Sequence, residues 1–305
     1  MKPYDILVAG EINPDLILAG NVKPEFGQVE KLVDSASLVI GSSSAIFACG
    51  AARLGLKVAF IGVCGDDIFG HFMLAAMQKR DVDVSSVMVR GDGETGLSVI
   101  LSRGVDRAIL TYQGLIAALR ASDIPNALLE KARHLHVASY FLQTNLQPEL
   151  PELFRRARGF GLTISLDPNY DPTELWSGFD ELLPVTNVFL PNEKEAVSLS
   201  GAEDVHAAAD RLGSRVETLV IKRGAEGALG VGDGEMVKLT SIPVNVVDTV
   251  GAGDSFDAGF LYGYLNHWSL EKSLRLACIC GGLSTQRAGG TDGQPTLDEA
   301  LAFLK

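Results

Sequence analysis

Short apolar runs rich in β-branched residues alternate along the chain with stretches that have a helical period. The runs predict strands at 6–10, 57–63, 135–139, 163–167, 188–191 and 218–222. The periodic stretches predict helices at 42–54, 67–79, 148–158, 193–199 and 202–212. Strands that alternate with helices in this way pair in parallel, with helices on both faces of the sheet. An α/β fold is therefore expected.

Two early segments, 15–38 and 93–111, break this rhythm. They combine strand propensity with turn residues and show no helical period. In the second, 97–101 and 108–112 read as a hairpin around 103–106.

Two strand segments that are inserted early in an α/β core, far apart in sequence, can pair into a small projecting sheet. We expect such a sheet to act as a lid, formed by segments at about 11–38 and 93–113. With the core it makes one domain over 1–305.

The last third of the chain changes pattern again. A predicted strand at 246–250 runs into the small-residue turn 251–254, followed by a helix at 255–265. A second helix is expected at 270–286, before a glycine-rich loop at 287–291.

Composition disfavours proteins that bind nucleic acid, cross a membrane or are secreted. The 305 residues carry a formal net charge of -12, which disfavours nucleic acid and anionic membranes as partners. No apolar run approaches the roughly 20 residues needed to cross a bilayer, and the N-terminus lacks a signal-peptide pattern. The cysteines show no zinc spacing and fit reduced core residues of a cytoplasmic protein; they are Cys49, Cys64, Cys278 and Cys280.

The turn into the helix at 255–265 has the composition of an anion site. Gly251, Ala252 and Gly253 leave the N–H groups of a helix start uncovered, where the helix dipole favours negative charge. Asp254 lies beside them and can accept a proton from an attacking hydroxyl. The alternative is that Asp254 only complements the helix dipole.

Longer motifs favour the first interpretation. The run from Asp248 to Phe256, Asp-Thr-Val-Gly-Ala-Gly-Asp-Ser-Phe, closely resembles the C-terminal signature of the PfkB, or ribokinase-like, carbohydrate kinases. Further motifs follow the order of that family and span nearly the whole chain: Gly10–Asp15, Asp167–Tyr170, Leu175-Trp176, Asn192–Glu195 and Lys222–Gly227. The resemblance implies a three-layer α/β/α core with a mostly parallel sheet, a β-sheet lid, ATP and Mg²⁺.

The resemblance also implies roles for individual residues. Asp254 would be the catalytic base, with the amides of Gly251, Ala252 and Gly253 as the anion hole. Nucleotide and magnesium would be held by Asn192, Glu195, Lys222, Gly224 and Gly227, with Glu195 acting on Mg²⁺ through water. The simpler reading of Asn192 is a helix cap, and of Lys222 a solvated lysine.

Substrate contacts are expected around Asp15, whose carboxylate can accept two hydroxyl hydrogen bonds. The remaining substrate candidates are Asn13, Gly41, Ser42, Arg107, Asp167 and Asn169. Asp248, Val250 and the loop 287–291 resemble the monovalent-cation region of the family, a potassium site. The apolar residues Leu16, Ile17 and Leu18 favour a homodimer that pairs through the lid.

The sequence departs from the family pattern at two positions. Ile46 stands where the family carries a sugar-contacting Asn, so that Ser42, Ser43 or Ser44 would supply the contact or the substrate lacks a group there. Asp171 stands where sugar-acid kinases commonly carry Arg, which argues against a carboxylate-bearing substrate.

Three alternatives to a sugar kinase have less support in the sequence. A nucleoside kinase of the same fold would suit the less polar Ile46 and Phe47. A non-catalytic binding protein would not require the full set of catalytic motifs. A dinucleotide-dependent oxidoreductase is disfavoured because the first strand is not followed by G-x-G-x-x-G.

Overall fold

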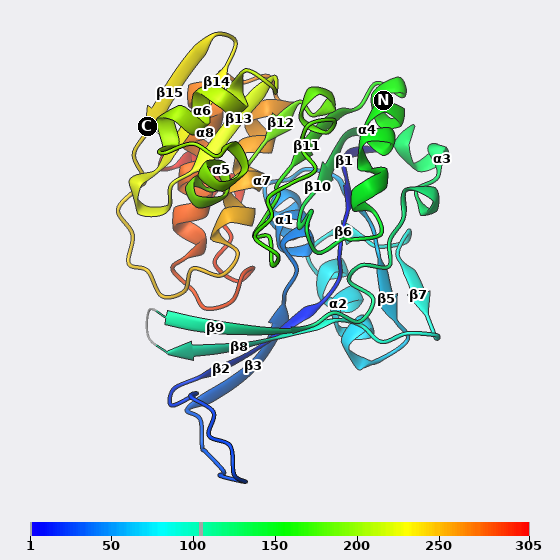
Figure 1. The fold of residues 1–305 in the computed structure, drawn as a ribbon, viewed down its shortest axis with the longest axis vertical. Coiled ribbons are helices and arrows are strands. Elements are labelled where there is room, and N and C mark those ends of the chain that lie inside the picture. Colours follow the sequence, from blue (N-terminus) through cyan, green and yellow to red (C-terminus); the bar gives the residue numbers. More distant parts are fainter. Residues whose placement is uncertain (1, 104–105, 305) are drawn as a thin grey trace.

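The predicted alternation produces one large sheet in the computed structural model, which describes residues 2–103 and 106–304 (Figure 1). Its strand order is β15-β14-β13-β12-β11-β10-β1-β4-β6. The pairs from β13 to β6 are parallel, whereas β14 and β15 are antiparallel at one edge. The strands are β1 (Tyr4–Ala9), β4 (Val58–Ile61), β6 (Val82–Asp83), β10 (Ala132–Val137), β11 (Thr163–Leu166), β12 (Val188–Phe189), β13 (Thr218–Lys222), β14 (Ala228–Gly232) and β15 (Glu235–Leu239).

Alternate residues of the strands enter two separate hydrophobic cores, one on each face of the sheet. In β1, Leu7 and Ala9 enter one core, and Ile6 and Val8 the other. The first is covered by α3 (Asn126–Leu129), α4 (Leu150–Gly159), α5 (Glu193–Ser200) and α6 (Val205–Gly213). The second is covered by α1 (Ser43–Arg53), α2 (Ile68–Gln78), α7 (Ala252–Leu265), α8 (Leu270–Ser284) and α9 (Leu297–Leu301). The expected three-layer α/β/α architecture with a mostly parallel sheet is confirmed.

Smaller elements complete the chain. Short 3-10 turns form η1 (Ala121–Asp123), η2 (Gln147–Glu149), η3 (Leu183–Val185) and η4 (Gly224–Glu226). A two-stranded parallel pair joins β5 (Val63–Gly65) to β7 (Met88–Arg90). The expected strand 57–63 therefore divides between β4 and β5.

The two early segments form a small sheet of order β3-β2-β8-β9, set apart from the core (Figure 1). Its strands are β2 (Pro14–Ala19), β3 (Ser35–Ile40), β8 (Leu97–Arg103) and β9 (Asp106–Tyr112). The predicted hairpin is β8 and β9, and Gly104 and Val105 of its turn lie outside the described residues. The long-range pair is β2 with β8, in parallel.

The register divides the small sheet into two faces. Leu38, Leu16, Val99 and Leu110 lie opposite one another in one row across the four strands. Ile17, one residue from Leu16, points to the other face, as does Asp15. Because the Asp15 carboxyl lies against Gly41 at the core, the row that contains Leu16 faces away from the core.

The expected strand at 246–250 is wrong. Residues 240–250 form no strand, and the N–H groups of Val247 and Asp248 donate to the Thr285 carbonyl at 2.8 and 3.1 Å. That carbonyl belongs to the C-cap of α8. The segment is thus hydrogen-bonded to the end of a helix and not to the edge of a sheet.

The structure bears on two further expectations, one about the cysteines and one about membrane-spanning helices. The described chain has its four cysteines free and buried. Within residues 2–103 and 106–304, no helix is both long and apolar enough to cross a membrane.

Candidate active site

The first turn of α7 presents unpaired N–H groups next to a buried carboxyl group. Gly251 is the N-cap, with a φ of 70° that favours glycine, and a Cβ there would lie 2.8 Å from Gly290 Cα. Asp254 follows in the first turn and is only 7% exposed. Within the described chain, the N–H groups of Gly251, Gly253 and Asp254 have no acceptor. These N–H groups and the helix dipole make an anion site.

One member of the expected anion hole is engaged differently. The Ala252 N–H donates to the Thr249 carbonyl at 3.3 Å, closing the turn that precedes the helix. The Asp254 N–H, by contrast, is unpaired although it was expected to supply only the base. The free donors therefore run from Gly251 through Gly253 to Asp254.

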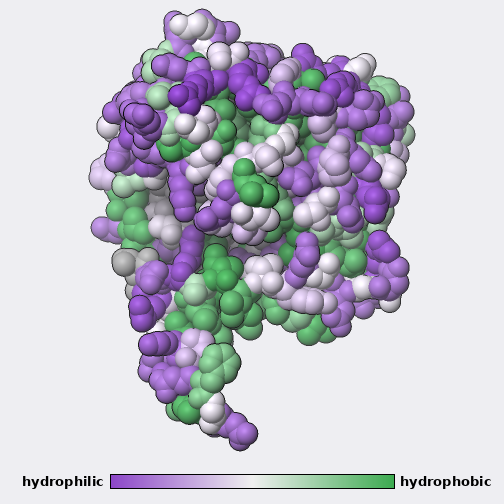
Figure 2. Space-filling view, viewed as in Figure 1, coloured by the Kyte–Doolittle hydropathy of each residue, from purple (hydrophilic) through white to green (hydrophobic). Residues whose placement is uncertain are grey.

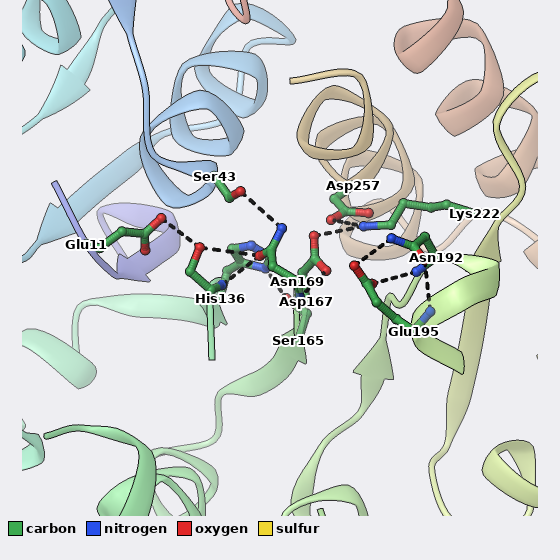
Figure 3. A network of polar contacts seen from close by, with 11 residues as sticks. Glu11, Ser43, His136, Ser165, Asp167, Asn169, Asn192, Glu195, Lys222 and Asp257 are labelled. Carbon is green, nitrogen blue, oxygen red and sulfur yellow. Dashed lines mark hydrogen bonds and ion pairs between the residues drawn. The ribbon is translucent and has the colours of Figure 1, made fainter. Parts of the chain in front are cut away.

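Lys222 lies at the centre of a buried ion-pair cluster (Figure 3). Its Nζ donates to Asp167 Oδ2 at 2.8 Å and to Asp257 Oδ2 at 3.1 Å. Both aspartates are 1% exposed. Burial alone would lower the pKa of Lys222, but the carboxylates of Asp167 and Asp257 outweigh burial and raise it. Lys222 is thus not a solvated strand-end lysine, and Asp167, a substrate candidate, is bound to it.

Asn192 and Glu195 form a reciprocal cap at the start of α5. The Asn192 side chain accepts from the Glu195 N–H at 2.9 Å, and the Asn192 N–H donates to Glu195 Oε2 at 2.8 Å. Burial and then the charge of Asp167 raise the pKa of Glu195 to about 7. The capping role is confirmed, and each Glu195 oxygen keeps a lone pair for a hydrated cation.

A cavity of about 560 Å³ opens beside the start of α7. Its wall includes Lys222 and Gly253 at the polar end, while Ile242, Val244 and Phe256 make it apolar farther along. Gly224 and Gly227 also line it. The volume and this division suit a ligand with a charged end and an apolar body.

The small sheet contributes two expected substrate residues, Asp15 at the start of β2 and Asn13 just before it. Asp15 is 7% exposed, and Gly41 must be a glycine because a Cβ there would lie 2.2 Å from Asp15 Oδ1. Burial raises the pKa of Asp15 to about 7, against the opposing charge of Arg107 on β9. The Asn13 amide donates to Ser98 Oγ at 3.3 Å. Four expected substrate residues therefore lie on or beside the small sheet.

The remaining substrate candidates belong to a hydrogen-bond network around Glu11 (Figure 3). Glu11, 2% exposed, accepts from the hydroxyls of Ser42, Ser44 and Ser139 at 3.0, 2.6 and 2.9 Å. The Asn169 amide accepts from the Ser139 N–H at 2.7 Å and donates to Ser43 Oγ at 3.1 Å. Ser42 and Ser44 are therefore committed inward, which leaves Ser43 as the half-buried hydroxyl of this turn.

Three residues of the same network carry backbone strain. Ser42, Ser139 and Asn169 adopt left-handed φ angles of 65°, 52° and 54°. Such conformations are costly for residues other than glycine and persist where surrounding contacts impose them, often at functional sites.

The expected cation region is brought together in part. Asp248 accepts from the N–H groups of Val250 and Gly289 at 3.0 and 2.9 Å, so its carboxylate joins the glycine-rich loop to the approach of α7. Of the residues that the structure describes, no group of three or more His, Cys, Asp or Glu side chains has metal-binding geometry.

Comparison with known proteins decides the family. Residues 5–297 match the pfkB family carbohydrate kinases. The chain belongs to this family. It is 29% identical over 324 residues to the 5-dehydro-2-deoxygluconokinase of Geobacillus thermodenitrificans, covering 100% of this chain and 94% of that one. It is 30% identical over 296 residues to the 2-dehydro-3-deoxygluconokinase of Bacillus subtilis, covering 92% and 90%.

Solved structures agree on the fold. Arabidopsis thaliana ribokinase complexed with ribose and ATP has a TM-score of 0.87 at 23% identity, covering 99% of each chain. A putative ribokinase II from E. coli in complex with ATP and Mg²⁺ gives 0.87 at 24% identity, again covering 99% of each chain. The protein is thus a carbohydrate kinase with a ribokinase-like fold.

Sequence reasoning missed two buried acids of this kinase, Glu11 and Asp257. Glu11 directly follows an apolar strand, and Asp257 lies three residues after Asp254, which puts both aspartates on one face of α7. Ile46 and Asp171, in contrast, have structural roles. Ile46 is 3% exposed and lies against Gly251, while Asp171 accepts from the Thr173 and Trp176 N–H groups.

We predict that Lys222→Met destabilises the kinase by about 3–5 kcal/mol at pH 8, because it leaves buried carboxyl groups without their cation. The loss should shrink towards pH 5, since protonation then neutralises the carboxylates. Urea unfolding at both pH values measures the change, with Lys238→Met on exposed β15 as the control. A loss below about 1 kcal/mol, or one independent of pH, would contradict the buried ion-pair cluster.

Proposed function

We propose that the protein transfers the γ-phosphate of ATP to a hydroxyl group of a small sugar, with Asp254 as catalytic base. The observation that carries this proposal is the position of Asp254. Its carboxyl group belongs to the same helical turn as the unpaired N–H groups, next to Gly253 of the 560 Å³ cavity wall, and it interacts with Ser43 and with the charge of Glu11. Phosphate donor and hydroxyl acceptor can thus meet at the same turn.

The chemistry follows from this arrangement. Asp254 takes the proton of the attacking sugar hydroxyl while the hydroxyl oxygen bonds to the γ-phosphorus. The bond from that phosphorus to the leaving ADP oxygen breaks. The N–H groups of Gly251, Gly253 and Asp254 face the negative charge on the transferred group. Glu195, with Asn192, would hold a hydrated Mg²⁺, which would neutralise phosphate charge when bound.

The nucleotide fits the cavity in the orientation set by its lining. Lys222 and the first turn of α7 form the end for the phosphates, and the apolar wall of Ile242, Val244 and Phe256 suits the base. A potassium ion beside Asp248 would order the loop 287–291 against the start of α7, as the hydrogen bond from Gly289 already does.

The acceptor is a neutral sugar rather than a sugar acid. Buried acids surround this side of the site, namely Glu11, Asp15 and Asp254, and Arg107 is the cation that acts on Asp15. Asp171 contributes no positive charge to the site. The nucleoside alternative loses its support because Ile46 and Phe47 are 3% and 1% exposed and Phe47 stacks on His136.

We expect turnover to rise with pH through a value near 8. Burial, and then the charge of Asp167, raise the pKa of Asp254 to about 8, and a base acts only after it has lost its proton. ADP release measured across a panel of neutral sugars, sugar acids and nucleosides tests both substrate and pH profile. Asp254→Asn should lower kcat by about 10²–10⁴-fold and leave ATP binding intact. Turnover equal to wild type in this variant would rule out Asp254 as the base.

We also propose that two copies pair through the small sheet. The row of Leu38, Leu16, Val99 and Leu110 faces away from the core, with Leu110 61% exposed. Figure 2 shows hydrophobic residues gathered at this end of the molecule. Packing of this row against the same row of a second copy of the chain would bury the apolar side chains.

Leu110→Asp should therefore convert a dimer into a monomer, since a charge would be buried in the interface. Light scattering at micromolar protein concentration measures the molecular mass in solution. Ile68→Asp is the control, because Ile68 is 77% exposed on α2, outside the small sheet. A monomeric wild type would refute the pairing.

A further inference from the structure

One oxygen of Asp257 lacks a hydrogen-bond partner although it is fully buried. Asp257 Oδ2 accepts from Lys222 Nζ at 3.1 Å, whereas Oδ1 has no partner in the part of the chain that the structure describes. An ionised carboxylate oxygen left without a donor is costly in a protein interior. A carboxylic acid is different, because its hydroxyl can donate to a nearby acceptor.

The Asp167 carboxylate is placed to be that acceptor. Asp167 Oδ2 lies 2.8 Å from the same Lys222 Nζ, so the two carboxyl groups meet at one ammonium group (Figure 3). They come from different elements, since Asp167 follows β11 and Asp257 belongs to α7. Both are only 1% exposed. A proton between them would satisfy the orphan oxygen and remove one of two adjacent buried negative charges.

The charged groups around this pair favour the same arrangement. Lys222 faces Asp257 from β13, Asp167 from the end of β11, and Asp254 from one turn earlier on α7. Glu195 on α5 adds a further acid that acts on Lys222. Four acidic side chains thus share a single ammonium group, which cannot balance all of them when ionised.

We propose that Asp257 is a protonated carboxylic acid that donates a hydrogen bond to Asp167, so that Lys222, Asp167 and Asp257 form a neutral set that fixes α7 to the sheet. The proton is taken from solvent as the chain folds. Burial, opposed by Lys222 and reinforced by Asp167, raises the pKa of Asp257 well above its ordinary value, in agreement with the geometry.

The set acts on the first turn of α7. Lys222 Nζ lies 3.6 Å from the position that a Cβ on Gly253 would occupy. Asp257 therefore holds the ammonium group against the turn that carries the unpaired N–H groups and Asp254. It is a positioning residue, and this consequence for catalysis rests on the proposed function, whereas its protonation does not.

Thermal unfolding between pH 5 and 8 tests the protonation without any substrate. The wild-type pair binds a proton that the unfolded chain releases above its ordinary aspartate pKa, so wild type loses stability as pH rises. Asp257→Asn has no such proton, and its amide can still donate to Asp167. The Tm difference between Asp257→Asn and wild type should therefore shift steadily in favour of the variant as pH rises. Asp210→Asn, on an exposed part of α6, should show a constant difference.

A Tm difference that does not change with pH would overturn the proposal, and so would an Asn variant that fails to fold. Asp257→Ala supplies the second comparison, because alanine cannot donate. With a sugar that is phosphorylated, we expect the Asn variant to retain at least tenfold more kcat than the Ala variant. Equal losses would contradict the donor role. If no sugar in the panel is phosphorylated, the proposed function fails, while the pH dependence of Tm still decides the protonation of Asp257.

Discussion

The pairing of one ammonium group with two buried carboxyl groups is the constraint on which the site depends. Lys222 reaches Asp167 and Asp257 at 2.8 and 3.1 Å, and these three residues come from β13, the end of β11 and α7. Removing Lys222 or Asp167 leaves a buried charge without a partner, which is more costly than losing a surface ion pair. The position of α7 relative to the sheet is therefore fixed by electrostatics as well as by packing.

This constraint explains how a site rich in acids can receive phosphates. The chain is acidic overall, with a formal net charge of -12, and Asp254, Asp167, Asp257 and Glu195 lie close together. The attraction for an anion comes from Lys222 and from N–H groups at a helix start, where the dipole is directed at the ligand. Raised pKa values of Asp254 and Glu195 reduce the negative charge of the site near neutral pH.

Local patterns predicted the layers but not the cross-chain contacts. The helix starts and the buried strands follow from periodicity and capping residues, and the Asp248–Phe256 run marks the start of α7. Burial of Glu11 and Asp257 depends on which elements pack together, which one chain segment cannot reveal. The strand expected at 246–250 failed for a similar reason, since the N–H groups of Val247 and Asp248 donate to the end of α8. Likewise, Leu16 and Ile17 looked equivalent until the register placed them on opposite faces.

Direct titration of Asp254 tests the central claim most closely. Carbon-13 NMR of the protein labelled at aspartate carboxyl groups, with Asp254→Asn used to assign the signal, reports its protonation without any assumption about substrate. We predict that Asp254 titrates near pH 8, because burial and the charge of Asp167 oppose its ionisation. Titration near the ordinary aspartate value of about 4 would contradict the buried, mutually dependent cluster on which this account is built.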